Sequence, residues 1–311
     1  MPLTVEKIGA PGPNATAPKP MKAIPVRHYG RWVAAVIILA LLGMLVYAFA
    51  QGDVNWGAIP DNFFNDEILR GVGKTVWITI ASMVLGVVLG IILAVMRLSK
   101  NPVTQAVAWG YIWFFRGTPV YVQLLLWFNL GLIFKYINLG PIYQDEWSDF
   151  MTPFLAALLG LGLNEAAYMA EICRAGLQAV DEGQTEAAQA LGMSHAKTLR
   201  RVVLPQAMRV IVPPTGNEFI NMLKTTSLVI AVQYWDLLQA AQEIGSNSGA
   251  SAEMLFLAAA WYLILTSVLS VGQYYLERYY ARGSTRNLPP TVFQRLRANL
   301  LSLSNRSGGV A

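Results

Sequence analysis

Residues 75–96 read TVWITIASMVLGVVLGIILAVM, an apolar stretch that ends at Arg97. An α-helix rises about 1.5 Å per residue, so roughly 20 apolar residues cross the hydrocarbon core of a bilayer, which is about 30 Å thick. The stretch is therefore predicted to span a membrane as one helix.

Five further apolar blocks lie along the chain, and together they predict an all-α integral membrane protein with six transmembrane helices. The composition agrees, because 55% of the 311 residues are hydrophobic and 13% are charged, whereas an average soluble domain has about 25% charged residues. The blocks at 103–136 and 210–235 are long or interrupted. The remaining blocks are 32–50, 153–173 and 254–276.

The distribution of basic residues predicts the topology. The net charge is +5, and nearly all Lys and Arg residues fall in segments on one side of the six blocks. The exceptions are Arg70, Lys74 and Lys135 on the opposite side and Lys224 within a block. Because basic loops resist translocation, both termini are predicted to be cytoplasmic. A membrane accounts for the positive charge, so no nucleic-acid partner is expected.

The ends of the chain differ in composition from its centre. Residues 1–31 are rich in proline and poor in large apolar side chains, which is typical of a disordered tail. Residues 281–311 are rich in Arg, Ser and Gly and are predicted to form a basic cytoplasmic tail. The block 32–50 ends in Ala-Phe-Ala, which resembles a signal-peptidase site. It is either an extra N-terminal transmembrane helix, which the long preceding segment favours, or a cleaved signal peptide.

The sequence lacks the residue clusters that enzyme or metal chemistry needs. Cys173 is the single cysteine, which excludes an intrachain disulfide, and His28 and His195 lie away from any metal-ligand spacing. Residues 71–75, GVGKT, resemble the end of a phosphate-binding P-loop, but Ile68 stands where that motif has its first glycine. The chain is predicted to be non-catalytic, with no metal and no cofactor of its own.

A polar segment, 174–209, separates the fourth and fifth blocks and is predicted to be helical and cytoplasmic. Acidic residues precede basic residues along it, as the helix dipole favours, and Gly183 and Gly192 are candidate helix breaks. Within this segment, a Glu-Ala-Ala group is followed at fixed distances by a glycine and by a Val-x-Leu-Pro group. These residues are Glu186, Ala187, Ala188, Gly192, Val202, Leu204 and Pro205.

This spacing resembles the EAA motif of ATP-binding-cassette (ABC) importer permeases, with Val202 where isoleucine is commoner. Three other stretches resemble the family members that import polar amino acids, the histidine, glutamine, glutamate, arginine and opine permeases. They are FRGTP at 115–119, NEAAYMAEICRAG at 164–176 and NEFINMLKTTSL at 217–228. The resemblance covers a permease domain at about 68–280 and implies five core helices, to which the block 32–50 adds one.

The resemblance also implies partners and a location. It implies two ATP-binding subunits that hold ATP and Mg²⁺, an extracytoplasmic substrate-binding protein, and a second permease chain, identical or different, among the lipids of a bacterial cytoplasmic membrane. The 174–209 loop would couple the chain to the ATPase, with two alanines allowing close approach and Glu186 capping the helix or pairing with a basic group. The expected coupling residues are Glu186, Ala187, Ala188, Gly192, Leu204 and Pro205.

Polar residues on two predicted spans indicate a path for the solute. Each span carries three of them at i, i+4 and i+7, which places them on one helix face, and ionisable groups at membrane depth usually face a cavity. The first stripe is Asn164, Tyr168 and Glu171, beside Glu165. The second is Asn217, Asn221 and Lys224, beside Glu218 and Thr225.

An amino acid needs an acceptor for its ammonium group and a donor for its carboxylate. Glu165 or Glu171 would be the acceptor, and Lys224 or Arg116 the donor. Alternatively, these charges neutralise one another and hold the helices together, and Arg116 anchors the chain at the inner interface. Pro119 and the pair 213–214 would kink their helices, either for gating or only for packing.

A second function class stays open, an ion-coupled secondary carrier of small polar solutes that works alone. That alternative leaves the EAA-like loop without a role. The identity of the solute is also open, because specificity would be shared with a binding protein.

Overall fold

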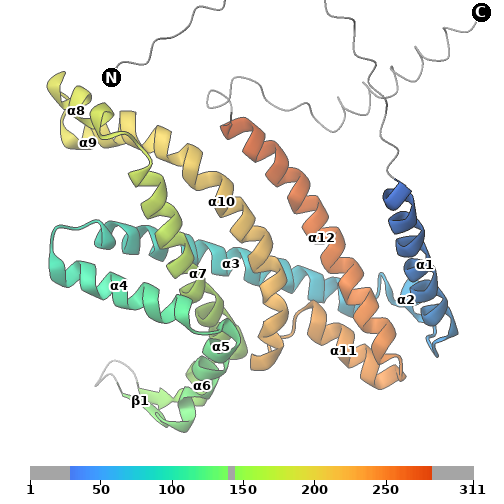
Figure 1. Ribbon diagram of the computed structural model, residues 1–311. Coiled ribbons are helices and arrows are strands. Elements are labelled where there is room, and N and C mark those ends of the chain that lie inside the picture. The colour runs from blue at the N-terminus through green and yellow to red at the C-terminus, as the bar shows by residue number, and fades with distance from the viewer. Residues whose placement is uncertain (1–28, 139–143, 282–311) are drawn as a thin grey trace, which may run out of the picture. The chain divides into compact units, whose positions relative to one another are not determined.

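The computed structural model describes residues 29–138 and 144–281 (Figure 1). The predicted tails therefore lie almost wholly outside the described residues. The chain divides into two units, Met1–Val54 and Asn55–Ala311.

In its described part, the first unit is one long helix, α1 (Tyr29–Gln51). Its mean hydropathy is 2.7 and none of its residues is buried. A helix that is apolar on all sides is stable in hydrocarbon, so α1 is suited to a membrane span. It begins three residues before the predicted block at 32–50.

The second unit is built from helices joined by short turns. Its first half contains α2 (Ala58–Asn62), α3 (Asp66–Arg97), α4 (Pro102–Gly117), α5 (Val120–Asn129), η1 (Leu130–Leu132), α6 (Trp147–Phe150) and α7 (Pro153–Gln178). Its second half contains α8 (Glu182–Ala190), α9 (His195–Thr198), η2 (Leu199–Val203), α10 (Leu204–Thr225), η3 (Thr226–Val232), α11 (Leu237–Ser248) and α12 (Ser251–Tyr280). A short antiparallel hairpin, β1 (Tyr136–Asn138) with β2 (Gln144–Glu146), departs from the all-α expectation.

Helix α3 packs against α7 along much of its length, and α7 and α10 cross it in Figure 1. Glycines on α3 permit this close approach. A β-carbon on Gly86 would lie 2.6 Å from Cγ of Glu165, and one on Gly90 would lie 2.5 Å from Cβ of Met169. A buried apolar cluster around Ile78, Leu124, Leu161, Val229 and Val232 joins α3, α5, α7 and η3.

Four helices among the described residues are long and apolar enough to span a membrane: α1, α3, α7 and α12. The block 103–136 is divided between α4 and α5, because Thr118 is extended before Pro119, as a residue preceding proline prefers. The block 210–235 is divided between α10 and η3. The count of six spans therefore stays a prediction.

Helix α10 begins at Leu204 and continues through Pro213 and Pro214, which lie inside the helix and not at its start. The main-chain oxygen of Pro213 accepts a hydrogen bond of 2.8 Å from Nε2 of Gln273 on α12. A neighbouring helix thus satisfies backbone polarity at the proline pair, as in other membrane helices that contain proline.

Candidate functional site

The site begins at the break between α4 and α5. Gln123, which is 1% exposed, donates from Nε2 to the main-chain oxygen of Phe115 at 2.9 Å and to Oγ1 of Thr118 at 2.7 Å. Nδ2 of Asn164 on α7 donates to the same Phe115 oxygen at 2.8 Å and to Oε1 of Gln123 at 3.1 Å. The last carbonyl groups of a helix have no partner within it, so these amides stabilise the end of α4.

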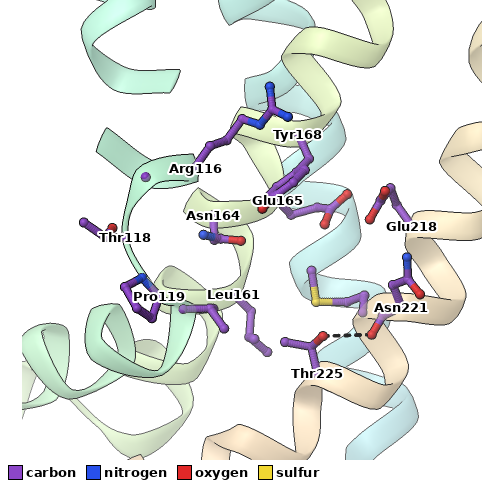
Figure 2. A pocket seen from close by; sticks show the side chains of 13 residues that line it. Arg116, Thr118, Pro119, Leu161, Asn164, Glu165, Tyr168, Glu218, Asn221 and Thr225 are labelled. Carbon is purple, nitrogen blue, oxygen red and sulfur yellow. Dashed lines mark hydrogen bonds between the residues drawn. The ribbon is translucent and has the colours of Figure 1, made fainter. Parts of the chain in front are cut away.

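A cavity of about 540 Å³ lies between this break, α7 and α10. Five of the predicted path residues line it: Arg116, Asn164, Glu165, Tyr168 and Asn221 (Figure 2). The wall also includes Glu218 and Thr225, which the sequence placed only beside the second stripe, and Thr118 and Pro119 from the break.

Two acids from different helices face this cavity. Glu165 is 5% exposed and its Oε1 has no hydrogen-bond partner among the described residues. Figure 2 shows its carboxylate directed toward that of Glu218 on α10. The negative charges of the two carboxylates repel each other. The absence of a side chain at Gly86 provides the space behind Glu165. A buried carboxylate with an unused acceptor atom is suited to bind a cationic ligand group.

One base lies at the other end of the same wall. The guanidinium of Arg116 lies 5.0 Å from the ring centroid of Tyr168, a cation–π contact. Within the described residues no carboxylate lies within salt-bridge distance of it, so its five donors are available. The cavity therefore combines one cationic and two acidic side chains.

The other predicted path residues lie outside the cavity. Oε2 of Glu171 accepts bonds of 2.6 and 3.1 Å from Arg174. Nδ2 of Asn217 donates to Oε1 of Glu277 at 3.3 Å. Lys224 is exposed and does not line the cavity.

Glu171 lies one turn beyond the lining residues of α7, whereas on α10 the cavity is lined by the side of the helix next to the predicted stripe. On α7 the lining face is Leu161, Asn164, Glu165 and Tyr168, and on α10 it is Glu218, Asn221, Met222 and Thr225. Both faces follow the i, i+3, i+4, i+7 pattern of one helix surface. The polar stripes predicted from the sequence share only some of their residues with these two cavity-lining faces.

The loop beyond α7 contains the residues of the EAA-like pattern. Asp181 caps α8 by accepting a bond of 2.7 Å from the backbone N–H of Gly183, so Gly183 lies in the first turn and does not break the helix. Gly192 follows the end of α8 with φ of +77°, a left-handed conformation that favours glycine. Thus one of the two predicted glycine breaks is present, and Asp181 has the capping position considered for Glu186.

Within α8 the two alanines of the pattern differ in exposure. Glu186 and Ala187 are exposed, whereas Ala188 is 5% exposed. Leu204 and Pro205 open α10 and are also exposed. The exposed members leave a surface on this loop that a second protein could contact.

The apolar helices, the charged cavity between them and the loop beyond α7 are features of a multi-pass membrane transport protein. The family of binding-protein-dependent transport system inner membrane components matches residues 86–282. The chain belongs to this family, and the resemblance predicted from its motifs is confirmed.

Similar proteins extend the comparison over most of the chain. The arginine transport system permease protein ArgU of Corynebacterium glutamicum is 53% identical over 280 residues, which are 89% of each chain. The nopaline transport system permease protein NocM of Agrobacterium fabrum is 37% identical over 205 residues, 66% of this chain and 83% of that protein. A crystal structure of an amino acid ABC transporter with histidines has a TM-score of 0.64 and 36% identity, covering 73% of this chain and 100% of that one.

Proposed function

We propose that this chain is the permease subunit of an ABC importer that moves a cationic polar amino acid across the bacterial cytoplasmic membrane. The observation that carries the proposal is the charge of the cavity. A cationic amino acid has two positive groups and one carboxylate, and the cavity offers two acids, Glu165 and Glu218, and one base, Arg116. The similarity to a protein named as an arginine permease supports the same substrate class.

The binding geometry follows from this complementarity. Glu165 and Glu218 accept hydrogen bonds from the ammonium and side-chain cation of the solute, and Arg116 donates to its carboxylate, each as a charge-assisted bond. Asn164, Asn221 and Tyr168 complete the polar wall. Glu171 pairs with Arg174 and Asn217 contacts Glu277, so neither they nor the exposed Lys224 are assigned to the solute.

Coupling to ATP is assigned to the 174–209 loop. Glu186, Ala187, Ala188, Gly192, Leu204 and Pro205 form the contact to a separate ATPase subunit, which binds ATP and Mg²⁺ and hydrolyses the nucleotide. The assembly comprises two ATPase subunits, a second permease chain and an extracytoplasmic binding protein. Movement of the docked loop shifts α7 and α10, between which the cavity lies, and so alternates access to it.

The topology belongs to the same proposal. The chain crosses the membrane six times with both termini in the cytoplasm, using α1 as an extra helix before a permease domain at 68–280. Four of the six spans are α1, α3, α7 and α12. The other two are the interrupted elements α4–α5 and α10–η3.

The decisive experiment is ATP-dependent uptake into membrane vesicles that contain this chain with its ATPase and binding protein. We expect uptake of labelled arginine or another cationic amino acid, and little uptake of glutamate. Uptake of glutamate in preference to arginine would reject the cationic substrate class. Transport that persists without the ATPase and follows an ion gradient would favour the secondary carrier.

A further inference from the structure

A second charged cavity adjoins the proposed solute cavity, with which it shares Arg116 and Gly117, and extends to the ends of α3 and α7. It has a volume of about 430 Å³ and is lined by Arg97, Arg174 and Glu171, together with Trp109, Trp113 and Arg116 of α4. We call it the arginine–tryptophan pocket. Arg97 is the last residue of α3, a helix long enough to span a membrane, and a basic residue at the end of such a helix is typical of a membrane interface.

The charges in this pocket do not balance. Glu171 accepts from Nη2 and Nε of Arg174 at 2.6 and 3.1 Å, and Nη1 of Arg174 donates to Gln178 at 2.6 Å. This is the one salt bridge within the described residues. Glu171 also attracts Arg97 and Arg116, but neither lies within salt-bridge distance of it, so three guanidinium groups face one carboxylate in this pocket. A guanidinium group with unused donors in a pocket of net positive charge is suited to bind an anionic oxygen group such as a phosphate.

The part of the wall contributed by α4 is aromatic and exposed. The rings of Trp109 and Trp113 stack with centroids 6.2 Å apart, and the side chains are 54% and 66% exposed. Exposed apolar residues of α3, Ile92 at 50% and Val95 at 62%, lie within a turn or two of Arg97 along the same helix. Tryptophan is enriched at the boundary between headgroups and acyl chains.

We infer that the arginine–tryptophan pocket binds the phosphate headgroup of an anionic membrane phospholipid. Arg97 holds the phosphate, the tryptophan pair packs against the glycerol region, and the acyl chains follow the apolar surface of α3. A free phosphate would use Arg97 but would leave the exposed tryptophans without a contact, which is why a lipid fits better than a soluble anion.

The test is native mass spectrometry of the assembled transporter complex with added phosphatidylglycerol or phosphatidylcholine. We expect phosphatidylglycerol to bind preferentially to the wild-type complex and R97Q to bind it about fivefold more weakly, the effect of one arginine near a membrane surface. The control is K100Q, which removes the same charge from an exposed lysine three residues away that does not line the pocket. R97K should bind at an intermediate level, because lysine keeps the charge but loses the bidentate geometry.

Several outcomes would overturn the inference. Equal binding of the two lipids to the wild-type complex would do so without any variant, even if R97Q failed to fold. Displacement of phosphatidylglycerol by millimolar glycerol 3-phosphate would assign the pocket to a soluble anion. Displacement by a transported amino acid would assign it to the solute path, and an R97Q complex with unchanged lipid preference would place the lipid elsewhere.

Discussion

Asn164 on α7 donates a hydrogen bond of 2.8 Å from Nδ2 to the main-chain oxygen of Phe115, in the last turn of α4. Gln123 on α5 donates to the same oxygen at 2.9 Å. Three helices therefore meet at one carbonyl group, and the wall of the proposed solute cavity depends on this meeting point.

The first prediction concerns Gln123. Replacing it with leucine keeps a similar volume but removes the buried donor to Phe115 and Thr118. We expect the unfolding free energy to fall by about 1–3 kcal/mol, the cost of leaving a buried polar group without a partner. Thermal unfolding of the purified protein in detergent measures the change. Gln105→Leu, at an exposed position, is the control and should leave the unfolding temperature unchanged.

The second prediction concerns the buried acid of the solute cavity. Glu165→Gln preserves shape but removes the negative charge, so the variant loses a charge-assisted bond worth about 1.5–3 kcal/mol. We expect the kcat/KM for uptake of a cationic amino acid to fall at least tenfold. Glu67→Gln, at an exposed position at the start of α3, should transport normally. Equal uptake by the Glu165 and Glu67 variants would contradict the assignment of the cavity.

The third prediction separates coupling from backbone strain. Gly192 and Gly249 have φ of +77° and +73°, and an added β-carbon would meet no atom within 4 Å at either position. Tryptophan at either position therefore imposes a similar backbone strain. We expect Gly192→Trp to abolish copurification with the ATPase, while Gly249→Trp, between α11 and α12, retains it. Loss of the ATPase in both variants would indicate a general folding defect.

The fourth prediction concerns pH and Asp236, a fully buried residue at the start of α11. Burial raises the pKa of its carboxyl group. Hydrogen bonds from the Gln239 N–H at 3.0 Å and the Tyr262 hydroxyl at 3.1 Å lower the pKa, but burial has the larger effect. The unfolded chain releases this proton at a lower pH than the folded protein does. The folded state therefore binds more protons in the interval between the two pKa values, and stability falls as the pH rises through it.

Asp236→Asn should remove this contribution, because asparagine cannot ionise and is an equally good N-cap residue. We expect the unfolding temperature of the wild type to decline more than that of the variant as the pH rises above the ordinary carboxyl pKa. Thermal unfolding across a pH series checks this expectation, with the exposed Asp61→Asn as a control. Parallel curves for the wild type and Asp236→Asn would rule out the effect.

Local sequence was sufficient for the elements whose cause is local. The apolar stretch at 75–96 forms the C-terminal two-thirds of α3, and Pro119 interrupts the third block as predicted. Gly192 ends α8 because its left-handed conformation costs glycine little. Gly183 gave a false signal of a break, because the first turn of a capped helix tolerates glycine where its N–H is already satisfied by Asp181.

The class of protein could be predicted from the sequence, since the length of the apolar blocks and the spacing within the 174–209 loop are properties of neighbouring residues. Which polar residues share a cavity became known from the three-dimensional packing. The choice of Glu165 over Glu171, and of Glu218 over Lys224, depends on where α7 and α10 cross and on which side of α10 faces the cavity. That geometry is fixed by packing between segments that are distant in the sequence, such as Gly86 against Glu165. The periodicity of polar residues within one helix carries no information about such contacts.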